Sequence, residues 1–105
     1  MTTPESVQAG AARLHAVRPQ ATIILFGSRA RGDARPDSDV DFMVVQPEVT
    51  SRREEMTALS NLLRPLRLQV DVLVASRRTF EKWAAIPGTI YHTVRTEGRV
   101  LYGEC

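Results

Sequence analysis

The sequence predicts an α/β fold, in which a sheet of about four short strands is covered by helices. Four short runs rich in apolar and β-branched residues are typical of strands. Between them, apolar residues recur every three or four positions, as on one face of a helix. The order helix, strand, loop, strand, helix, strand, helix, helix, strand is typical of α/β proteins. Residues 1–105 are expected to form one domain, because two separate cores of that size would each be marginal.

The chain is expected to begin with a helix. Thr3 suits the N-cap, where its hydroxyl can accept a backbone hydrogen bond, and Pro4 suits the first helical position. Val7, Ala11 and Leu14 then recur on one helix face.

Two strands separated by a loop are predicted next. Pro19 closes the first helix, and the apolar run 21–26 is typical of a buried strand. Residues 28–38 are polar and must include a loop. Residues 39–45 form the second predicted strand.

A second long helix follows, because Ser51 and Glu54 have the spacing of a capping box. Its end is expected near Pro65, since the residue before a proline disfavours helical geometry. The apolar stripe of this helix consists of Met56, Leu59 and Leu63.

The third strand is predicted over residues 69–74, and Ser76 is expected to cap the helix that follows. That helix is expected to bury Phe80 and Trp83. It is interrupted at Pro87-Gly88.

A further helical stretch and a last strand complete the predicted fold. Gly98 is a good residue for the position just after a helix end. Residues 100–102 form the last, short strand. The helical stretch contains the apolar residues Ile90, Tyr91 and Val94.

The composition is that of a soluble globular protein, with 43% hydrophobic and 25% charged residues. No apolar run approaches the roughly 20 residues that cross a membrane, and no secretory signal is present. Cys105 is the only cysteine, so neither a disulfide nor a zinc site is expected, and we expect a cytoplasmic protein. The net charge is only +2, which favours a solvated basic surface over sequence-specific nucleic-acid binding.

Three features carry the predicted chemistry, and the first is Gly27-Ser28 directly after a buried strand. A glycine here lets the backbone turn sharply and approach a ligand. Ser28 can then cap a short helix whose free N–H groups point at phosphate. The alternative is an ordinary turn from a strand into a helix.

The second feature is Asp39-Val-Asp41 at the start of a strand. Residues i and i+2 project to the same side of a strand, so both carboxylates face one place. A divalent cation would remove their mutual repulsion, and carboxylate oxygens are ligands that Mg²⁺ prefers. The alternative is a solvated turn at the strand entrance.

The third feature is Asp71, in the middle of an apolar strand, where an unpaired carboxylate is costly to bury. If this strand lies beside the one that starts at Asp39, Asp71 can join the same acidic cluster. The alternative is a salt bridge to an arginine such as Arg67.

Together these residues resemble a known signature. Gly27-Ser-Arg-Ala-Arg-Gly32 followed by Ser38-Asp-Val-Asp41 is similar to the motif of the DNA polymerase β-type nucleotidyltransferase superfamily, and most similar to its minimal nucleotidyltransferase (MNT) branch. The resemblance covers nearly the whole chain. It implies a mixed sheet of about four strands with flanking helices.

The resemblance also implies a reaction, in which a nucleoside monophosphate passes from a nucleoside triphosphate such as ATP to a hydroxyl. Ser28, in the Gly27-Ser28 turn, would contact the triphosphate. Asp39 and Asp41 would coordinate two Mg²⁺ ions, and Asp71 would ligate the ion nearest the attacking hydroxyl.

Arg29 and Arg31 match positions that are often basic in this family, and they could pair with phosphates. They could equally bridge to Asp33 or Asp37.

MNT proteins are typically paired with a HEPN-domain protein, often as antitoxin and toxin. The resemblance therefore implies an antitoxin that transfers AMP to a hydroxyl of the HEPN partner, a tyrosine by analogy. The rival hypotheses are a non-catalytic binding antitoxin of the same fold and a small-molecule nucleotidyltransferase of the aminoglycoside-modifying type. No acceptor domain follows the last strand, so a partner or a second copy of the chain is expected to supply the acceptor site. Phe80, Trp83 and Tyr91 could help to dock it, although their helical spacing favours burial.

Overall fold

The computed structural model describes residues 3–35 and 38–103. Its sheet has the order β3-β2-β1-β4. The strands are β1 (Thr22–Phe26), β2 (Val40–Gln46), β3 (Val70–Ser76) and β4 (Arg99–Tyr102). β1 runs antiparallel to both β2 and β4, whereas β2 and β3 are parallel. The predicted mixed sheet of four strands is therefore confirmed.

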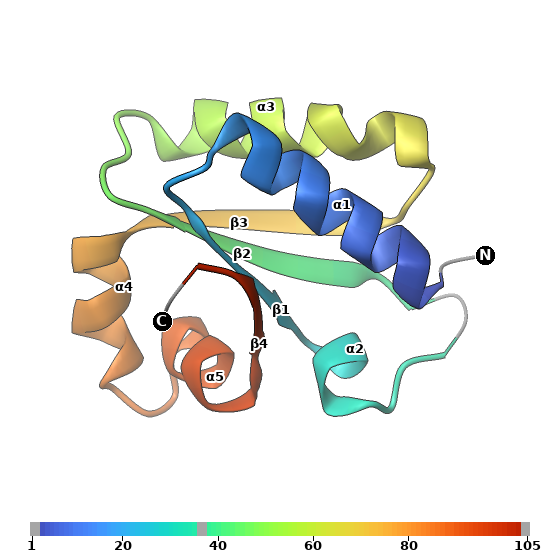
Figure 1. Cartoon of the computed structure of the whole chain (residues 1–105). Coiled ribbons are helices and arrows are strands. Elements are labelled where there is room, and N and C mark those ends of the chain that lie inside the picture. Colours follow the sequence, from blue (N-terminus) through green and yellow to red (C-terminus); the bar gives the residue numbers. More distant parts are fainter. Residues whose placement is uncertain (1–2, 36–37, 104–105) are drawn as a thin grey trace.

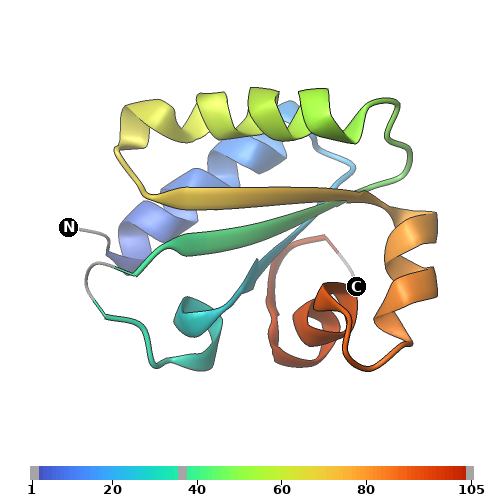
Figure 2. The ribbon, with the colours of Figure 1, turned by 180° about the vertical axis from the view of Figure 1, so that it is seen from behind.

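Helices cover both faces of this sheet (Figure 1). α1 and α3 lie on one face, and α4 and α5 lie on the other. The short helix α2 follows β1 directly. Figure 2 shows β3 from behind, running below α3. The helices are α1 (Pro4–Val17), α2 (Ser28–Arg31), α3 (Arg52–Leu63), the 3₁₀ turn η1 (Arg64–Leu66), α4 (Arg77–Ala84) and α5 (Ile90–Glu97).

The alternation of side chains along the central strands divides the core into two layers. Phe42 and Val44 of β2 pack under α1 and α3, together with Leu14. Met43 points to the other face and packs with Phe80 of α4. Each strand thus has one set of side chains for each helical layer.

The predicted helix starts are confirmed by their caps. The hydroxyl of Thr3 accepts a hydrogen bond from the backbone N–H of Ser6 at 3.1 Å. Ser51 and Ser76 cap α3 and α4 in the same way. Serine and threonine favour this position because the hydroxyl satisfies an N–H group that has no partner within the helix.

One expectation about the second half of the chain is wrong. Phe80 is buried as expected, but Trp83 is 40% exposed. Phe80 and Ala84 lie four positions apart and together face the sheet, which leaves Trp83 on the flank of α4. Gly98 directly follows the end of α5, as predicted, but its backbone is extended rather than left-handed. A side chain there would instead collide with Ile24 and with the carbonyl of Val94.

A half-buried ion pair joins three elements at the end of α1. The guanidinium of Arg18 donates two hydrogen bonds to the carboxylate of Glu55 on α3, one of them 2.8 Å long. The side-chain amide of Gln46, at the end of β2, donates to the same carboxylate. These donors, Arg18 above all, lower the pKa of Glu55 despite the opposing effect of burial.

Glu55→Gln is therefore expected to lower the free energy of unfolding by about 1 kcal/mol at pH 7. Because the folded pKa lies below the unfolded value near 4.5, the ionised carboxylate stabilises the fold above that pH, and this stabilisation disappears as the pH falls through the folded pKa. The difference in the free energy of unfolding between the variant and the wild type should accordingly shrink as the pH is lowered. Urea unfolding at pH 7 and below pH 4 measures it. The exposed neighbour Glu54, replaced in the same way, should show no such effect.

No helix of the described residues is long and apolar enough to cross a membrane. Asp37 and Cys105, which figure in the sequence analysis, lie outside the described residues.

Candidate active site

Asp41 and Asp71 occupy facing positions on neighbouring parallel strands. The register of β2 and β3 pairs Asp41 with Asp71 directly. Residues in register on adjacent strands project to the same face of a sheet. This face is the one that α4 and α5 cover further along the strands. The sequence hypothesis required that Asp71 lie beside the strand of Asp41, and it does.

Electrostatics show that Asp39 belongs to the same group. Burial is the largest cause that raises the pKa of Asp41, followed by the charges of Asp71 and Asp39, while Arg31 acts in the opposite direction. Asp41 is half-buried, because the buried Phe26 lies opposite it on β1. Three carboxylates therefore share one region of negative potential.

The three carboxylates of this group are not engaged in ion pairs that stabilise the fold. Within the described residues, Asp39, Asp41 and Asp71 form no ion pair, and the alternative bridge from Asp71 to Arg67 does not occur. Asp71 is exposed, so the strand does not bury its carboxylate and the cost of doing so does not arise. The reason is that its end of the sheet face is left open, whereas Leu73 and Ala75 further along pack with the second core layer.

The metal-ligand assignment of these residues stays a prediction. In the described part of the chain, no group of three His, Cys, Asp or Glu side chains is arranged closely enough to hold a metal ion. The chemistry of the donors nevertheless fits Mg²⁺, since all three are carboxylates and the charge of Arg31 offsets only part of their effect on Asp41.

Gly27 forms the turn that brings the backbone over Asp41. Its φ of +77° and ψ of −158° belong to a region that only glycine populates readily. A Cβ atom at this position would collide with Oδ2 of Asp41. Both the conformation and the contact therefore require glycine, and the backbone approaches the acidic group closely.

The expectation that Ser28 caps the short helix is wrong. Gly27 occupies the N-cap of α2, and Ser28 is the first helical residue. The Ser28 hydroxyl forms no hydrogen bond to a described residue, while its carbonyl accepts from the backbone N–H groups of Gly32 and Asp33. The contact of Gly27 and Ser28 with a triphosphate stays a prediction.

The two arginines of α2 do different things. Arg29 donates to the carbonyl of Ser38 at 2.8 Å and to that of Arg35 at 3.3 Å, so it fastens the loop that carries Asp39. Arg31 lies 3.4 Å from Asp33, as the sequence analysis allowed, and its charge reaches Asp41. Their contacts with phosphate stay predictions, and the geometry favours Arg31 for that role.

Sequence reasoning gave Glu97, the last residue of α5, no role in the site. Its Oε1 lies 3.7 Å from Nη1 of Arg31, so α5 is joined to the edge of the acidic group. Only the folded arrangement reveals this contact, because the two residues lie 66 positions apart in the sequence.

Comparisons with known proteins identify sequences related to this chain. Residues 12–97 match the model of the nucleotidyltransferase domain family. A Methanocaldococcus jannaschii protein named as a candidate protein adenylyltransferase is 35% identical over 80 residues, which is 76% of either chain.

Solved structures share the fold. A candidate nucleotidyltransferase of Sulfolobus solfataricus superimposes with a TM-score of 0.66 at 19% identity, covering 95% of this chain and 79% of the other. A chain from a toxin–antitoxin complex with AMP-PNP gives 0.56 at 23% identity, covering 92% and 73%. A chain from the complex of a tri-AMPylated Shewanella oneidensis HEPN toxin with its MNT antitoxin gives 0.56 at 21% identity, covering 95% and 71%.

Proposed function

This chain belongs to the nucleotidyltransferase domain family, and from that premise we propose that it transfers AMP from ATP to a hydroxyl of a HEPN-class partner protein in the cytoplasm. The hydroxyl is that of a tyrosine, and the transfer neutralises a toxin. The observation that carries the proposal is the pairing of Asp41 with Asp71 on one sheet face, beside Asp39 and under the Gly27 turn.

The residues of the site divide the work of this reaction. Asp39, Asp41 and Asp71 would hold two Mg²⁺ ions, whose positive charge compensates the triphosphate and favours ionisation of the attacking hydroxyl. Gly27 and Ser28 supply backbone N–H groups at the start of α2, which suits phosphate oxygens. Arg31 adds a positive charge beside the acidic group, and Arg29 holds the loop from which Asp39 projects.

Two relatives support a protein as the acceptor. The Methanocaldococcus jannaschii relative is named for protein adenylylation, and the Shewanella oneidensis complex contains a HEPN toxin that carries AMP. Orientation of the attacking hydroxyl supplies much of the rate in group transfer, and a folded partner that presents its own tyrosine would provide it.

The isolated chain is therefore expected to modify free small acceptors poorly and a HEPN partner efficiently. Transfer of radiolabelled AMP from ATP in the presence of Mg²⁺ should be compared between a HEPN protein, aminoglycosides and RNA ends. Mass spectrometry then locates the modified residue, and chelation of the metal by EDTA serves as the control. Efficient modification of an aminoglycoside would favour the small-molecule function. Neutralisation of the HEPN toxin without transfer would favour the non-catalytic antitoxin.

A further inference from the structure

Exposed apolar side chains gather at the turn between α4 and α5. Trp83, Ile86 and Ile90 are 40%, 43% and 44% exposed, and we call these three residues the α4–α5 patch. Among the described residues, five large apolar side chains are this exposed, and three of them fall within these eight positions. Such a concentration is unlike the scattered apolar exposure of an ordinary protein surface.

Hydrogen bonds hold the patch in one shape. The hydroxyl of Thr89 donates to the carbonyls of Trp83 and Ile86, both at 2.9 Å, and accepts from the backbone N–H of His92. The ring Nδ1 of His92 lies 2.9 Å from the carbonyl of Ala84. A surface that is already ordered loses little conformational entropy when a partner binds.

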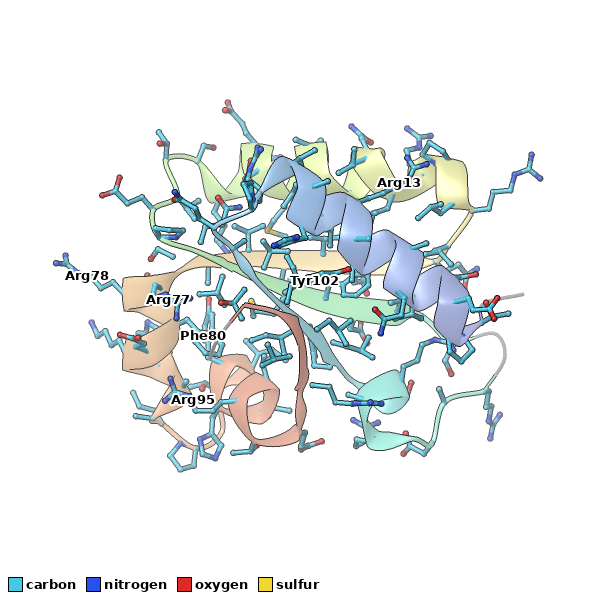
Figure 3. The ribbon with its side chains drawn as sticks, in the orientation of Figure 1. Arg13, Arg77, Arg78, Phe80, Arg95 and Tyr102 are labelled. Atoms are coloured by element: carbon cyan, nitrogen blue, oxygen red, sulfur yellow. The ribbon has the colours of Figure 1, made fainter. Side chains whose placement is uncertain are left out.

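Positive charges without carboxylate partners flank the patch. Arg78, Lys82 and Arg95 are exposed, and none of them forms an ion pair with a described residue. Lys82 lies over the ring of Trp83, and Arg95 lies over that of Phe80, 5.5 and 5.4 Å from the ring centres. Figure 3 shows Arg78 pointing away from α4, and Arg95 beside Phe80 on the same flank. Glu81 is the acidic residue of α4, so positive charge dominates this flank.

The patch is joined to the candidate active site by α5. This helix runs from Ile90, in the patch, to Glu97, which pairs with Arg31 beside Asp41. Seven residues of helix span about 10 Å. A protein seated on the patch that also extends along α5 would therefore reach the open end of the sheet face from which Asp41 and Asp71 project.

We infer that the acceptor protein docks on the α4–α5 patch, and that it contacts the patch through apolar side chains flanked by aspartates and glutamates. This inference rests on the proposed function. Carboxylates of the acceptor pair with Arg78, Lys82 and Arg95, which fixes the orientation of the complex. Trp83 fills an apolar recess of the acceptor, as tryptophan does at the centre of many interfaces.

Two other occupants fit this surface less well. A second copy of the chain would bring the same three cations against each other. Single-stranded RNA would meet the cations, but Trp83 is the one patch residue on which a base could stack, because Ile86 and Ile90 have no rings.

The only tryptophan of the chain provides a direct probe of docking. Labelling with 5-fluorotryptophan gives one ¹⁹F resonance, from Trp83, while the HEPN acceptor stays unlabelled. Titration with the acceptor should shift this resonance and reduce its sensitivity to solvent. Ile86→Glu, and the pair Arg78→Glu with Lys82→Glu, should each weaken binding at least about tenfold.

Matched controls lie on the opposite layer of the molecule. Val17 of α1 is 40% exposed, like the patch residues, so Val17→Glu introduces the same change elsewhere. Arg13→Glu on α1 (Figure 3) reverses an exposed positive charge away from the patch, and so it is the control for the charge reversals at Arg78 and Lys82. Both controls should bind the acceptor like the wild type, and all variants should keep the melting temperature and the affinity for ATP with Mg²⁺.

The outcomes separate this inference from the proposed function. If the wild type modifies the acceptor and the patch variants bind it equally well, the docking inference is wrong and the function stands. If the wild type modifies no protein, the proposed function is wrong. Docking is then tested by comparing the binding of two helical peptides that each present leucines on one face. One peptide is rich in glutamate, and the other has lysine in place of each glutamate. Selective binding of the glutamate peptide supports the inference, and equal or absent binding overturns it. A shift of the Trp83 resonance by a 20-nucleotide RNA, but by no protein or peptide, also overturns it.

Discussion

Replacing Asp41 or Asp71 with asparagine is expected to reduce AMP transfer about 100-fold or more while leaving the metal-free protein at least as stable as the wild type. Asparagine keeps the shape of aspartate but removes the charge that would bind Mg²⁺. It also removes one of the like charges that, with burial, raise the pKa of Asp41. The loss of function and the retention of stability should therefore appear in the same variant.

The dependence of stability on pH has a defined sign for Asp41. Its folded pKa lies above the unfolded value of 3.8, so the group favours the fold most at low pH and this contribution is lost as the pH rises through the folded pKa. The advantage of Asp41→Asn over the wild type should accordingly grow as the pH rises from below 3.8 to neutrality. Melting temperatures without metal, with added Mg²⁺ and over this pH range measure the effect.

Glu48→Gln is the matched control, because Glu48 is an exposed carboxylate beyond the other end of β2. It should change neither transfer nor stability. A clear fall in the metal-free melting temperature of Asp41→Asn or Asp71→Asn would mean that these residues are structural partners rather than metal ligands.

Gly27→Ala is expected to have the second large effect. The alanine would adopt a backbone conformation that costs on the order of 1–3 kcal/mol, and its Cβ would push the carboxylate of Asp41 aside. Both the melting temperature and the affinity for ATP with Mg²⁺ should fall, and transfer should be lost with them. Calorimetric titration of the folded variant measures the affinity.

Gly88→Ala separates the two causes. Gly88 also has a positive φ, +91°, but no atom lies near its missing side chain. It should lose stability through backbone strain while ATP binding stays normal. In addition, Gly27→Ala should lower the melting temperature less when Asp41 is already alanine, because the clash with the Asp41 carboxylate is then absent. Equal damage in both backgrounds would show that Asp41 and Gly27 are not coupled.

Local signals were sufficient to predict most of the fold from the sequence. Thr3, Ser51 and Ser76 each begin a helix because a short hydroxyl side chain satisfies a backbone group nearby. The alternation along residues 39–45 correctly separates Asp41 from Phe42, since the geometry of a strand sends neighbours to opposite faces. Such rules depend on a few adjacent residues only.

The remaining features depend on contacts between distant segments. Whether Asp71 lies next to Asp41 is decided by the pairing of β2 with β3. The sequence of either strand alone does not indicate which strand it pairs with. Helical spacing suggested burial of Trp83. However, the side of α4 that faces the sheet carries Phe80 and Ala84, and Trp83 lies on the flank of the helix. The pairing of Arg31 with Glu97 likewise appears only when α2 and α5 converge.

If Asp41 and Asp71 act together as proposed, the register of β2 and β3 makes activity a measure of correct folding. A slip of one residue would turn Asp71 toward the apolar layer under α3, where Val72 and Val74 now lie. A chain with slipped strands could not retain partial activity, because the carboxylates of Asp41 and Asp71 would then stand on opposite faces of the sheet. Each molecule is thus either complete or inactive, and the specific activity of a preparation reports the fraction of chains whose strands are correctly aligned.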